Sequence, residues 1–235
     1  MSGLPISSNT DKEMKIMKKL VLWDIDGTIL TDGGAGHRAF EKAIGSFLNL
    51  AKIRHVRKAG KTDPAIIREM LMANGYDHGQ IDVTSKLLNE YAKYFAEEFS
   101  KAKDAKLISN SYDAVTALAG NGDCVQGLVT GNLKSIALDK MRKFGLIAYL
   151  ADGGFGSDSD ERNAIAEIAV KRFRKKYPDI AEIFLVGDTQ SDIRAGKHIG
   201  AIVIAVGTAE KRAEFEAAGA DFIMGNLKEI SQIIK

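Results

Sequence analysis

Apolar, strand-like runs that alternate with helical patterns constrain the fold of this chain most strongly. Each run is short and continuous, ends in small or acidic residues, and is followed by a segment with helical periodicity. The runs are LVLWD at 20–24, CVQGLVT at 124–130, IFLVGD at 183–188, AIVIAVG at 201–207 and DFIM at 221–224. Continuous apolar runs suit strands buried on both faces, and strands separated by helices pair in parallel through right-handed crossovers. The pattern therefore predicts an α/β fold with a doubly wound parallel sheet.

A long interval separates the first two of these runs. It spans about a hundred residues without a strand-like run and contains three helical patterns, at 37–48, 64–74 and 84–99. Asp63 is expected to cap the second helix, with Pro64 at its first position. Three amphipathic helices inserted into one crossover can bury their apolar stripes only against each other, so we expect a small helical lobe beside the sheet.

This interval predicts two domains in a discontinuous arrangement. We expect a Rossmann-like core domain made of 19–32 and 107–235, with a helical cap domain at 33–106 inserted after the first strand. Glycines at 33, 34 and 36 favour a hinge where the chain enters the cap. Residues 1–18 are polar and lack sustained periodicity, so we expect them to form a flexible leader without a role in function.

Composition excludes several classes of protein. The 33 basic and 31 acidic side chains give a net charge of +2, too balanced for a surface that binds nucleic acid. No apolar run approaches the roughly 18 to 20 residues of a membrane-spanning helix, and the N-terminal segment lacks the apolar stretch of a secretion signal. We therefore expect a cytoplasmic protein with neither nucleic-acid nor membrane partners. Cys124 is the only cysteine, which excludes an intrachain disulfide.

Acidic side chains stand at the predicted carboxyl ends of two strands, the edge where open α/β sheets bind ligands. The first strand delivers Asp24 and Asp26, two residues apart on one side of an extended segment. A later strand ends in Asp188, and Asp192 follows one helical turn behind it. Carboxylates this close repel each other unless a cation or a shared proton relieves them. Because the sequence shows no histidine cluster and one cysteine, these hard oxygen ligands predict a magnesium site.

A metal at this edge makes phosphate the natural ligand of the site. The second strand ends in Thr130, Gly131 and Asn132 and leads into a helix, so a hydroxyl and free backbone donors are placed to hold phosphoryl oxygens. A cationic side chain is also expected near the transferring charge. Arg162, at the start of a predicted helix, is the first candidate for this role, and Lys134 is the alternative.

Three segments resemble the signatures of the haloacid dehalogenase superfamily, in the family's order and each at a strand end. LVLWDIDGTIL is similar to the first signature, GLVTGN to the second and FLVGDTQSDIRAG to the acidic last one. The resemblance covers the chain from Lys19 onward, and the helical insert resembles the cap that members carry after the first strand. The chain looks most similar to the phosphoglycolate-phosphatase-like group with a helical cap.

The resemblance implies a catalytic role for four residues. Asp24 would attack phosphorus and form an aspartyl-phosphate intermediate. Asp26 would protonate the leaving alcohol and then take a proton from the hydrolytic water. Thr130 would bind a phosphoryl oxygen, and Arg162 would grip both the phosphate and Asp24 at a position where the family more often has lysine. Dehalogenase members lack an aspartate at the place of Asp26, so its presence points to phosphoryl transfer.

The resemblance also implies a metal ion and a set of substrate contacts. Magnesium would be held by the carboxylates of Asp24 and Asp188, by the backbone carbonyl of Asp26, and by Asp192 directly or through water. The residues assigned to substrate binding are Gly27, Thr28, Gly131, Asn132 and Lys61. The last of these belongs to AGKTDP at 59–64, which resembles the cap loop that closes over the substrate.

Together these features predict a magnesium-dependent phosphatase that hydrolyses a small phosphorylated metabolite, phosphoglycolate or a similar monoester. Two alternatives stay open: a phosphomutase on the same scaffold, and a binding or regulatory protein that kept the fold and lost the reaction. Three residues also have a purely structural interpretation. In it Asp192 caps the helix that follows, Arg162 is a surface residue and Lys61 is a solvated loop lysine.

Overall fold

The computed structural model describes residues 17–76 and 81–234. Within them, six strands form one parallel sheet in the order β5-β4-β1-β6-β7-β8. The strands are β1 (Lys18–Trp23), β4 (Cys124–Val129), β5 (Gly153–Gly154), β6 (Ile180–Gly187), β7 (Ile202–Val206) and β8 (Phe222–Met224). The predicted α/β fold with a parallel sheet is confirmed. Of the expected leader at 1–18, residues 1–16 lie outside the described residues, and Lys18 is the first residue of β1.

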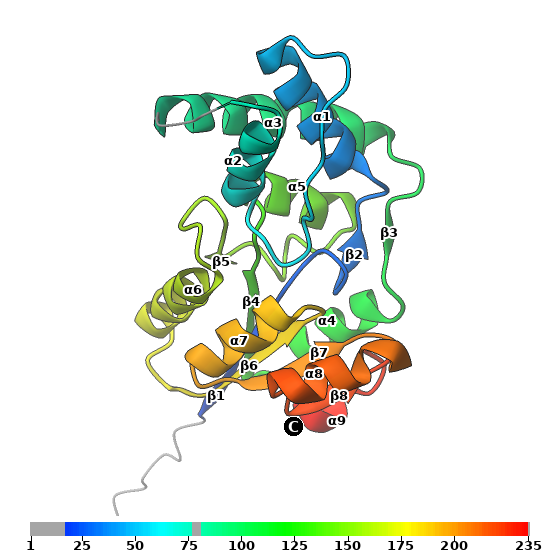
Figure 1. Cartoon of the computed structure of the whole chain (residues 1–235). Helices are drawn as coiled ribbons and strands as arrows, with labels where there is room; N and C mark the ends of the chain where they lie inside the picture. Colours follow the sequence, from blue (N-terminus) through cyan, green and yellow to red (C-terminus); the bar gives the residue numbers. More distant parts are fainter. Residues whose placement is uncertain (1–16, 77–80, 235) are drawn as a thin grey trace, which may run out of the picture.

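Helices cover both faces of this sheet (Figure 1). They are α4 (Ser111–Ala119), α5 (Lys134–Lys143), α6 (Arg162–Lys176), α7 (Gln190–His198), α8 (Arg212–Ala218) and α9 (Ile230–Ile233), with a short 3-10 helix at Ala209–Lys211. Leu20 and Leu22 of β1 pack with side chains of α6 and α7, whereas Val21 and Trp23 pack with α4, α5 and α9. The central strand is therefore apolar on both faces, as its continuous run predicted. None of the helices described here is long and apolar enough to span a membrane.

Three helices stand beyond the carboxyl edge of the sheet: α1 (Ala35–Leu48), α2 (Asp63–Ala73) and α3 (Ile81–Lys101) (Figure 1). Phe40 and Phe95 belong to the apolar cluster that they share. The expectation that these helices bury their stripes only against each other is wrong, because Leu133 and Ile136 around the start of α5 join the same cluster. We propose that the three helices form the cap domain at 33–106, and we call them the cap.

A short antiparallel pair joins the two chain segments that connect cap and sheet. β2 (Leu30–Thr31) leads into the cap and β3 (Lys106–Leu107) leads out of it. Directly after β2, Gly33 and Gly34 have φ angles of 61° and 78°, in the left-handed region that glycine adopts without strain. These two short strands were not predicted, because two residues are too few to show a pattern.

Two further local details differ from the sequence-based expectation. The N-cap residue of α2 is Thr62 and not Asp63, which is the first residue of the helix. The Thr62 hydroxyl accepts a hydrogen bond from the backbone N–H of Ala65 at 3.3 Å. The edge strand β5 consists of Gly153 and Gly154, so it has no apolar side chains by which a sequence pattern could reveal it.

Candidate active site

A cavity at the carboxyl edge of the sheet, between the core helices and the cap, contains most of the predicted site residues. β1, β4 and β6 end side by side there, because Trp23 pairs with Leu128 on one side and with Val186 on the other. The cavity has a volume of about 540 Å³. The predicted residues that line it are Asp24, Asp26, Lys61, Thr130, Gly131, Asn132, Arg162, Asp188 and Asp192.

Gly27 and Thr28, which were expected to bind substrate, do not line this cavity. Thr28 is fully buried, and its hydroxyl has no hydrogen-bond partner among the described residues. Gly27 has a φ of 88°, and a Cβ atom at this position would lie 2.3 Å from Oδ2 of Asp188. The glycine therefore allows the turn after β1 to lie directly against Asp188.

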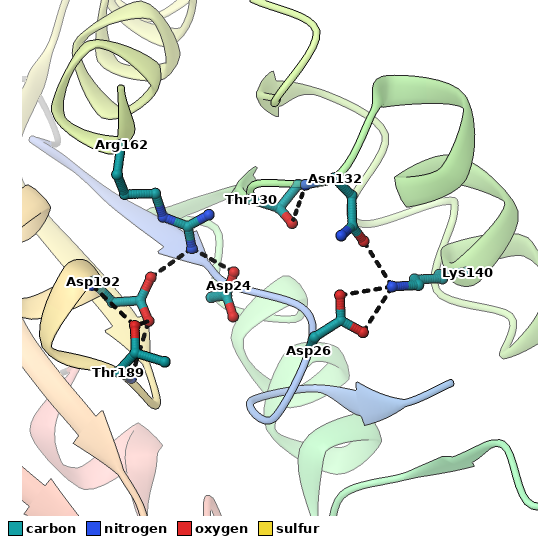
Figure 2. Close-up of polar contacts among 8 residues, drawn as sticks. All are labelled: Asp24, Asp26, Thr130, Asn132, Lys140, Arg162, Thr189 and Asp192. Atoms are coloured by element: carbon teal, nitrogen blue, oxygen red, sulfur yellow. Dashed lines mark hydrogen bonds and ion pairs between the residues drawn. The ribbon is translucent and has the colours of Figure 1, made fainter. Parts of the chain in front are cut away.

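Arg162 lies between two of the acids (Figure 2). Its Nη2 atom is 2.5 Å from Oδ1 of Asp24 and 2.5 Å from Oδ1 of Asp192, and the arginine side chain is only 10% exposed. The structural interpretation of Arg162 as a surface residue is therefore wrong. Lys134, the alternative cation, is exposed, and its ammonium lies 5.5 Å from the centre of the Phe155 ring.

Asp192 contributes both to the start of α7 and to the cavity. Its Oδ2 atom accepts hydrogen bonds from the hydroxyl and the backbone N–H of Thr189, at 2.6 and 3.1 Å, in a capping box at the start of α7. Its other oxygen binds Arg162. The N-cap residue of α7 is Thr189, so the expectation that Asp192 itself caps the helix is wrong. Asp192 lies in the first turn, completes the capping box and at the same time places a carboxylate at the edge of the cavity.

The carboxylates around Arg162 are crowded and poorly solvated. Burial and the nearby carboxylates of Asp192 and Asp188 raise the pKa of Asp24 well above its ordinary value, although Arg162 opposes this rise. Burial and the carboxylate of Asp192 also raise the pKa of Asp188 to about 6. Lys211, whose ammonium lies 3.5 Å from Oδ2 of Asp188, opposes this second rise without cancelling it. The positive charge of Arg162 and Lys211 therefore does not fully offset the three acids.

The three acids have the chemistry that a divalent metal ion requires. Asp24, Asp188 and Asp192 each offer a carboxylate oxygen, and these oxygens all lie within 4.8 Å of one another. The Oδ1 atom of Asp188 is buried and has no hydrogen-bond partner among the described residues. An orphaned buried oxygen and a set of oxygen-only ligands fit magnesium, because a hard cation prefers oxygen and would relieve the repulsion.

Folding also brings together two histidines that the sequence analysis did not treat as a cluster. The rings of His37 and His55 stack with their centres 4.2 Å apart, and Glu41 lies 2.9 Å from Nε2 of His55. These three side chains have a spacing compatible with a metal ion, but all three are exposed on the cap. Their mutual contacts account for the arrangement without a metal.

Lys140 is the site residue that sequence reasoning missed. Its ammonium lies 2.7 and 2.6 Å from the two carboxylate oxygens of Asp26 and 2.7 Å from Oδ1 of Asn132 (Figure 2). The lysine side chain is 2% exposed. One signal for it exists in the sequence: Lys140 is four residues after Ile136 and directly precedes Met141, so it falls on the apolar stripe of a helix that follows the Asn132 loop.

The cap loop before α2 lies directly against the loop after β4. The backbone N–H of Asp63 donates to the carbonyl of Gly131 at 2.8 Å, and a Cβ atom on Gly131 would lie 2.3 Å from the carbonyl oxygen of Lys61. The ammonium of Lys61 is ion-paired with Glu69. Lys61 therefore borders the cavity, as expected, but its charge is already matched by a carboxylate of its own domain.

Comparison with known proteins adds three findings. The family model described as haloacid dehalogenase-like hydrolase matches residues 21–206 of the chain. No curated protein sequence gives a significant match. Solved structures do match, including a haloacid dehalogenase-like hydrolase, SP0104 from Streptococcus pneumoniae, with a TM-score of 0.61, 16% identity and coverage of 94% of this chain and 100% of that one.

Two further solved structures are similar over nearly the same length. CbbY from Rhodobacter sphaeroides, in complex with phosphate, has a TM-score of 0.71 and 17% identity over 91% of this chain and 96% of that one. A predicted phosphoglycolate phosphatase from Haemophilus somnus 129PT has a TM-score of 0.67 and 16% identity over 94% of this chain and 100% of that one. At these identities the similarity establishes the fold.

Proposed function

The chain belongs to the haloacid dehalogenase-like hydrolase family, and we propose that it is a magnesium-dependent phosphatase of small phosphate monoesters. The observation that carries this proposal is that two acids with different surroundings, Asp24 and Asp26, border one cavity. The side chain of Asp24 is 9% exposed and bound by Arg162, whereas the side chain of Asp26 is 43% exposed and bound by Lys140. A nucleophile and a proton donor require such separate environments.

The first half of the proposed reaction transfers the phosphoryl group to Asp24. Its carboxylate attacks phosphorus while the bond between phosphorus and the alcohol oxygen breaks, which gives an aspartyl-phosphate. The hydrogen bond from Arg162 at 2.5 Å fixes the orientation of the attacking carboxylate and adds a positive charge beside the phosphoryl oxygens. Asp26 gives its proton to the departing alcohol, so that no alkoxide has to leave.

The second half releases phosphate and restores the enzyme. Asp26, now a carboxylate, takes a proton from a water molecule, whose oxygen attacks phosphorus and displaces Asp24. Lys140 contacts both oxygens of Asp26 and therefore holds the carboxyl group in one orientation through both steps. The products are the free alcohol and inorganic phosphate, and both aspartates return to their starting protonation states.

The loop after β4 supplies donors for the phosphoryl oxygens. The Thr130 hydroxyl accepts a hydrogen bond from the backbone N–H of Asn132 at 3.2 Å, which leaves its own proton to donate to a ligand. Phosphate as the ligand of this site is also supported by the similarity to CbbY, which was solved in complex with phosphate.

Magnesium fits the remaining part of the site. Asp24 and Asp188 would hold the ion together with the backbone carbonyl of Asp26, and Asp192 would hold a metal-bound water because Arg162 and Thr189 already engage its oxygens. When bound, the ion offsets the charge of a phosphate that approaches a carboxylate.

A screen of phosphate esters tests the proposal. We expect the purified protein to release inorganic phosphate from p-nitrophenyl phosphate and from small alkyl esters such as phosphoglycolate when magnesium is present. A chelator should abolish the release and added magnesium should restore it. Asp24→Asn should lose activity by several orders of magnitude, as nucleophile variants do, with an unchanged circular dichroism spectrum because asparagine can still contact Arg162.

Other results of this screen would contradict the proposal in distinguishable ways. Unchanged turnover by Asp24→Asn would remove Asp24 from its role. Isomerisation of a sugar phosphate without net release of inorganic phosphate would indicate a phosphomutase. Absence of turnover with every ester, by a folded protein that contains magnesium, would indicate a binding or regulatory protein.

A further inference from the structure

The cap supplies part of the lining of the cavity that contains Asp24. Once the phosphoryl group occupies the end beside Asp24, the alcohol part of the substrate extends toward the residues of α1 and of the loop before α2. The cap residues that border the cavity include His37, Phe40, His55, Val56 and Lys58. What these side chains bind determines which phosphate monoester the protein accepts, so this inference rests on the proposed function.

The cations around the cavity differ in how their charge is matched. Lys140 is paired with Asp26, and Lys61 is paired with Glu69. Arg162 is paired with Asp24 and Asp192. Lys58 is different: across the described parts of the chain, no carboxylate lies within 4.0 Å of its ammonium, and its hydrogen-bond partner is a histidine nitrogen.

The surroundings of Lys58 leave its ammonium able to bind a ligand. Its Nζ atom lies 3.0 Å from Nδ1 of His37 and 5.1 Å from the centre of the Phe40 ring. Burial and the adjacent Lys58 ammonium lower the pKa of His37, so near neutral pH the ring is uncharged and its Nδ1 can accept this hydrogen bond. An ammonium has three N–H donors, of which this contact uses one.

The carboxylates nearest to Lys58 bind other groups and do not pair with its ammonium. Asp32 accepts hydrogen bonds from the backbone N–H groups of Gly34 and Gly36 at 2.8 and 2.9 Å, so it caps the start of α1. Glu41 lies against the two histidines instead, with its Oε1 atom 2.9 Å from Nε2 of His55 and 3.7 Å from Nε2 of His37. Lys58 is half-buried, and burial lowers its pKa although the more distant Asp32, Glu41 and Asp63 oppose this fall. A half-buried cation without a close anion favours the arrival of one.

We propose that Lys58, whose ammonium is held by Nδ1 of His37, binds a second anionic group on the alcohol part of the substrate. The substrate class is then a phosphate monoester with a carboxylate or a second phosphate at its far end. Both groups present oxygen acceptors to an ammonium, and a charge-assisted hydrogen bond of this kind contributes about ten- to hundred-fold to binding.

Matched pairs of esters test the proposal and separate the two anions. Phosphoglycolate is compared with ethyl phosphate, and 1,3-propanediol bisphosphate with 3-hydroxypropyl phosphate, because each pair differs in the terminal anion. We expect kcat/KM to be about ten- to hundred-fold higher for the anionic member of at least one pair. The pair with the larger ratio identifies the anion. Equal kcat/KM within both pairs would overturn the proposal.

Variants of Lys58 assign the preference to this residue. Lys58→Met should reduce the preference for the anionic member by about ten- to hundred-fold, with the neutral ester changed less than about two-fold. Lys58→Arg keeps the charge and should retain part of the preference. Lys52→Met is the matched control, because Lys52 is an exposed lysine of the same loop that does not border the cavity, and it should change neither ester. An equal loss on both esters in Lys58→Met would contradict the proposal.

Binding to an inactive variant provides a measurement that does not depend on turnover. Titration calorimetry of Asp24→Asn with phosphoglycolate and with 1,3-propanediol bisphosphate should give, for at least one of them, a Kd about ten- to hundred-fold lower than for the double variant with Lys58→Met. If no ester is hydrolysed, the proposed function fails, and this titration still decides on the subsite. Equal Kd values for the two variants would refute it.

Discussion

A single buried lysine, Lys140, links the cap to the proposed proton donor. Its ammonium lies on both oxygens of Asp26 and 5.3 Å from the centre of the Phe95 ring in α3. Burial opposes its charge, but the carboxylates of Asp26, Asp32 and Asp63 outweigh burial and raise the pKa of Lys140. The lysine therefore stays charged. It binds Asp26 from the buried side, while the partly exposed carboxylate borders the cavity.

The substitution Lys140→Met tests this positioning role. We expect kcat for an alkyl phosphate to fall about ten- to hundred-fold, because a loosely held Asp26 protonates a poor leaving group less effectively. The kcat for p-nitrophenyl phosphate should fall less, since nitrophenolate leaves without a proton. Stability should change little, because methionine keeps the apolar stem and the remaining carboxylate of Asp26 can be solvated.

Lys134→Met provides the control on the same helix. Lys134 is exposed at the start of α5 and does not border the cavity, so its removal should leave both kcat values within about two-fold of the wild type. A loss of equal size on the two esters in Lys140→Met would show that Lys140 does not act through Asp26.

Two loops approach each other closely at the mouth of the cavity, and glycines permit the approach. A Cβ atom on Gly131 would lie 2.3 Å from the carbonyl oxygen of Lys61. On the cap side, Gly60 has a φ of 72°, and a Cβ there would lie 2.7 Å from Oγ of Ser191. The packing of the cap loop against the loop after β4 and the start of α7 therefore depends on the absence of two side chains.

The substitution Gly131→Ala tests the importance of this approach. The added methyl group meets backbone rather than a flexible side chain, so the cap loop has to move away from the core. We expect a loss of about 1 to 3 kcal/mol in the free energy of unfolding and a higher KM. Urea denaturation and steady-state kinetics measure the two effects. Gly122→Ala, where a Cβ would have no atom within 4 Å, should leave both quantities almost unchanged.

Asp63, the first residue of α2, connects the cap to the segment that leads into α5. It is 2% exposed, and its Oδ2 atom accepts a hydrogen bond from the backbone N–H of Leu133 at 2.8 Å. The hydroxyl of Tyr91 lies 3.4 Å from the other oxygen. Burial raises the pKa of Asp63 to about 7, although the Leu133 N–H and Lys140 oppose this rise.

This raised pKa predicts a pH dependence of stability. The folded protein binds the Asp63 proton more tightly than the unfolded chain, so the contribution of Asp63 to stability falls as pH rises from about 4 to about 7 and is constant above that range. The total loss is at most a few kcal/mol, because a tenfold difference in proton affinity between the folded and unfolded chain is worth about 1.36 kcal/mol. Asp63→Asn should remove this dependence, because an amide oxygen can still accept from Leu133 without a charge.

Urea denaturation of wild type and Asp63→Asn between pH 5 and 9, in the presence of a chelator, measures the effect. Asp24 and Asp188 titrate in both proteins, so the difference between the two curves isolates Asp63. The variant should gain stability relative to the wild type as pH rises. Parallel curves would show that Asp63 does not titrate in this way.

The sequence was sufficient for the parallel sheet and for the acids at its edge. Each strand is a local apolar run, except the two-glycine edge strand β5, and Asp24, Thr130 and Asp188 directly follow the ends of β1, β4 and β6. A side chain that follows a strand needs no long-range information to be placed, because the carboxyl ends of parallel strands meet at one edge of the sheet.

The contacts between residues far apart in the sequence depended on tertiary packing. Lys140 meets Asp26, and Asp63 meets Leu133, across 114 and 70 residues of sequence. Neither pair follows from a local pattern, because a helix can pack at the carboxyl edge of a sheet in many orientations. The apolar contacts of Leu133 and Ile136 with the cap select the orientation of α5. Only the tertiary structure shows that Lys61 is paired with a carboxylate of the cap, whereas Lys58 borders the cavity without a paired carboxylate among the described residues.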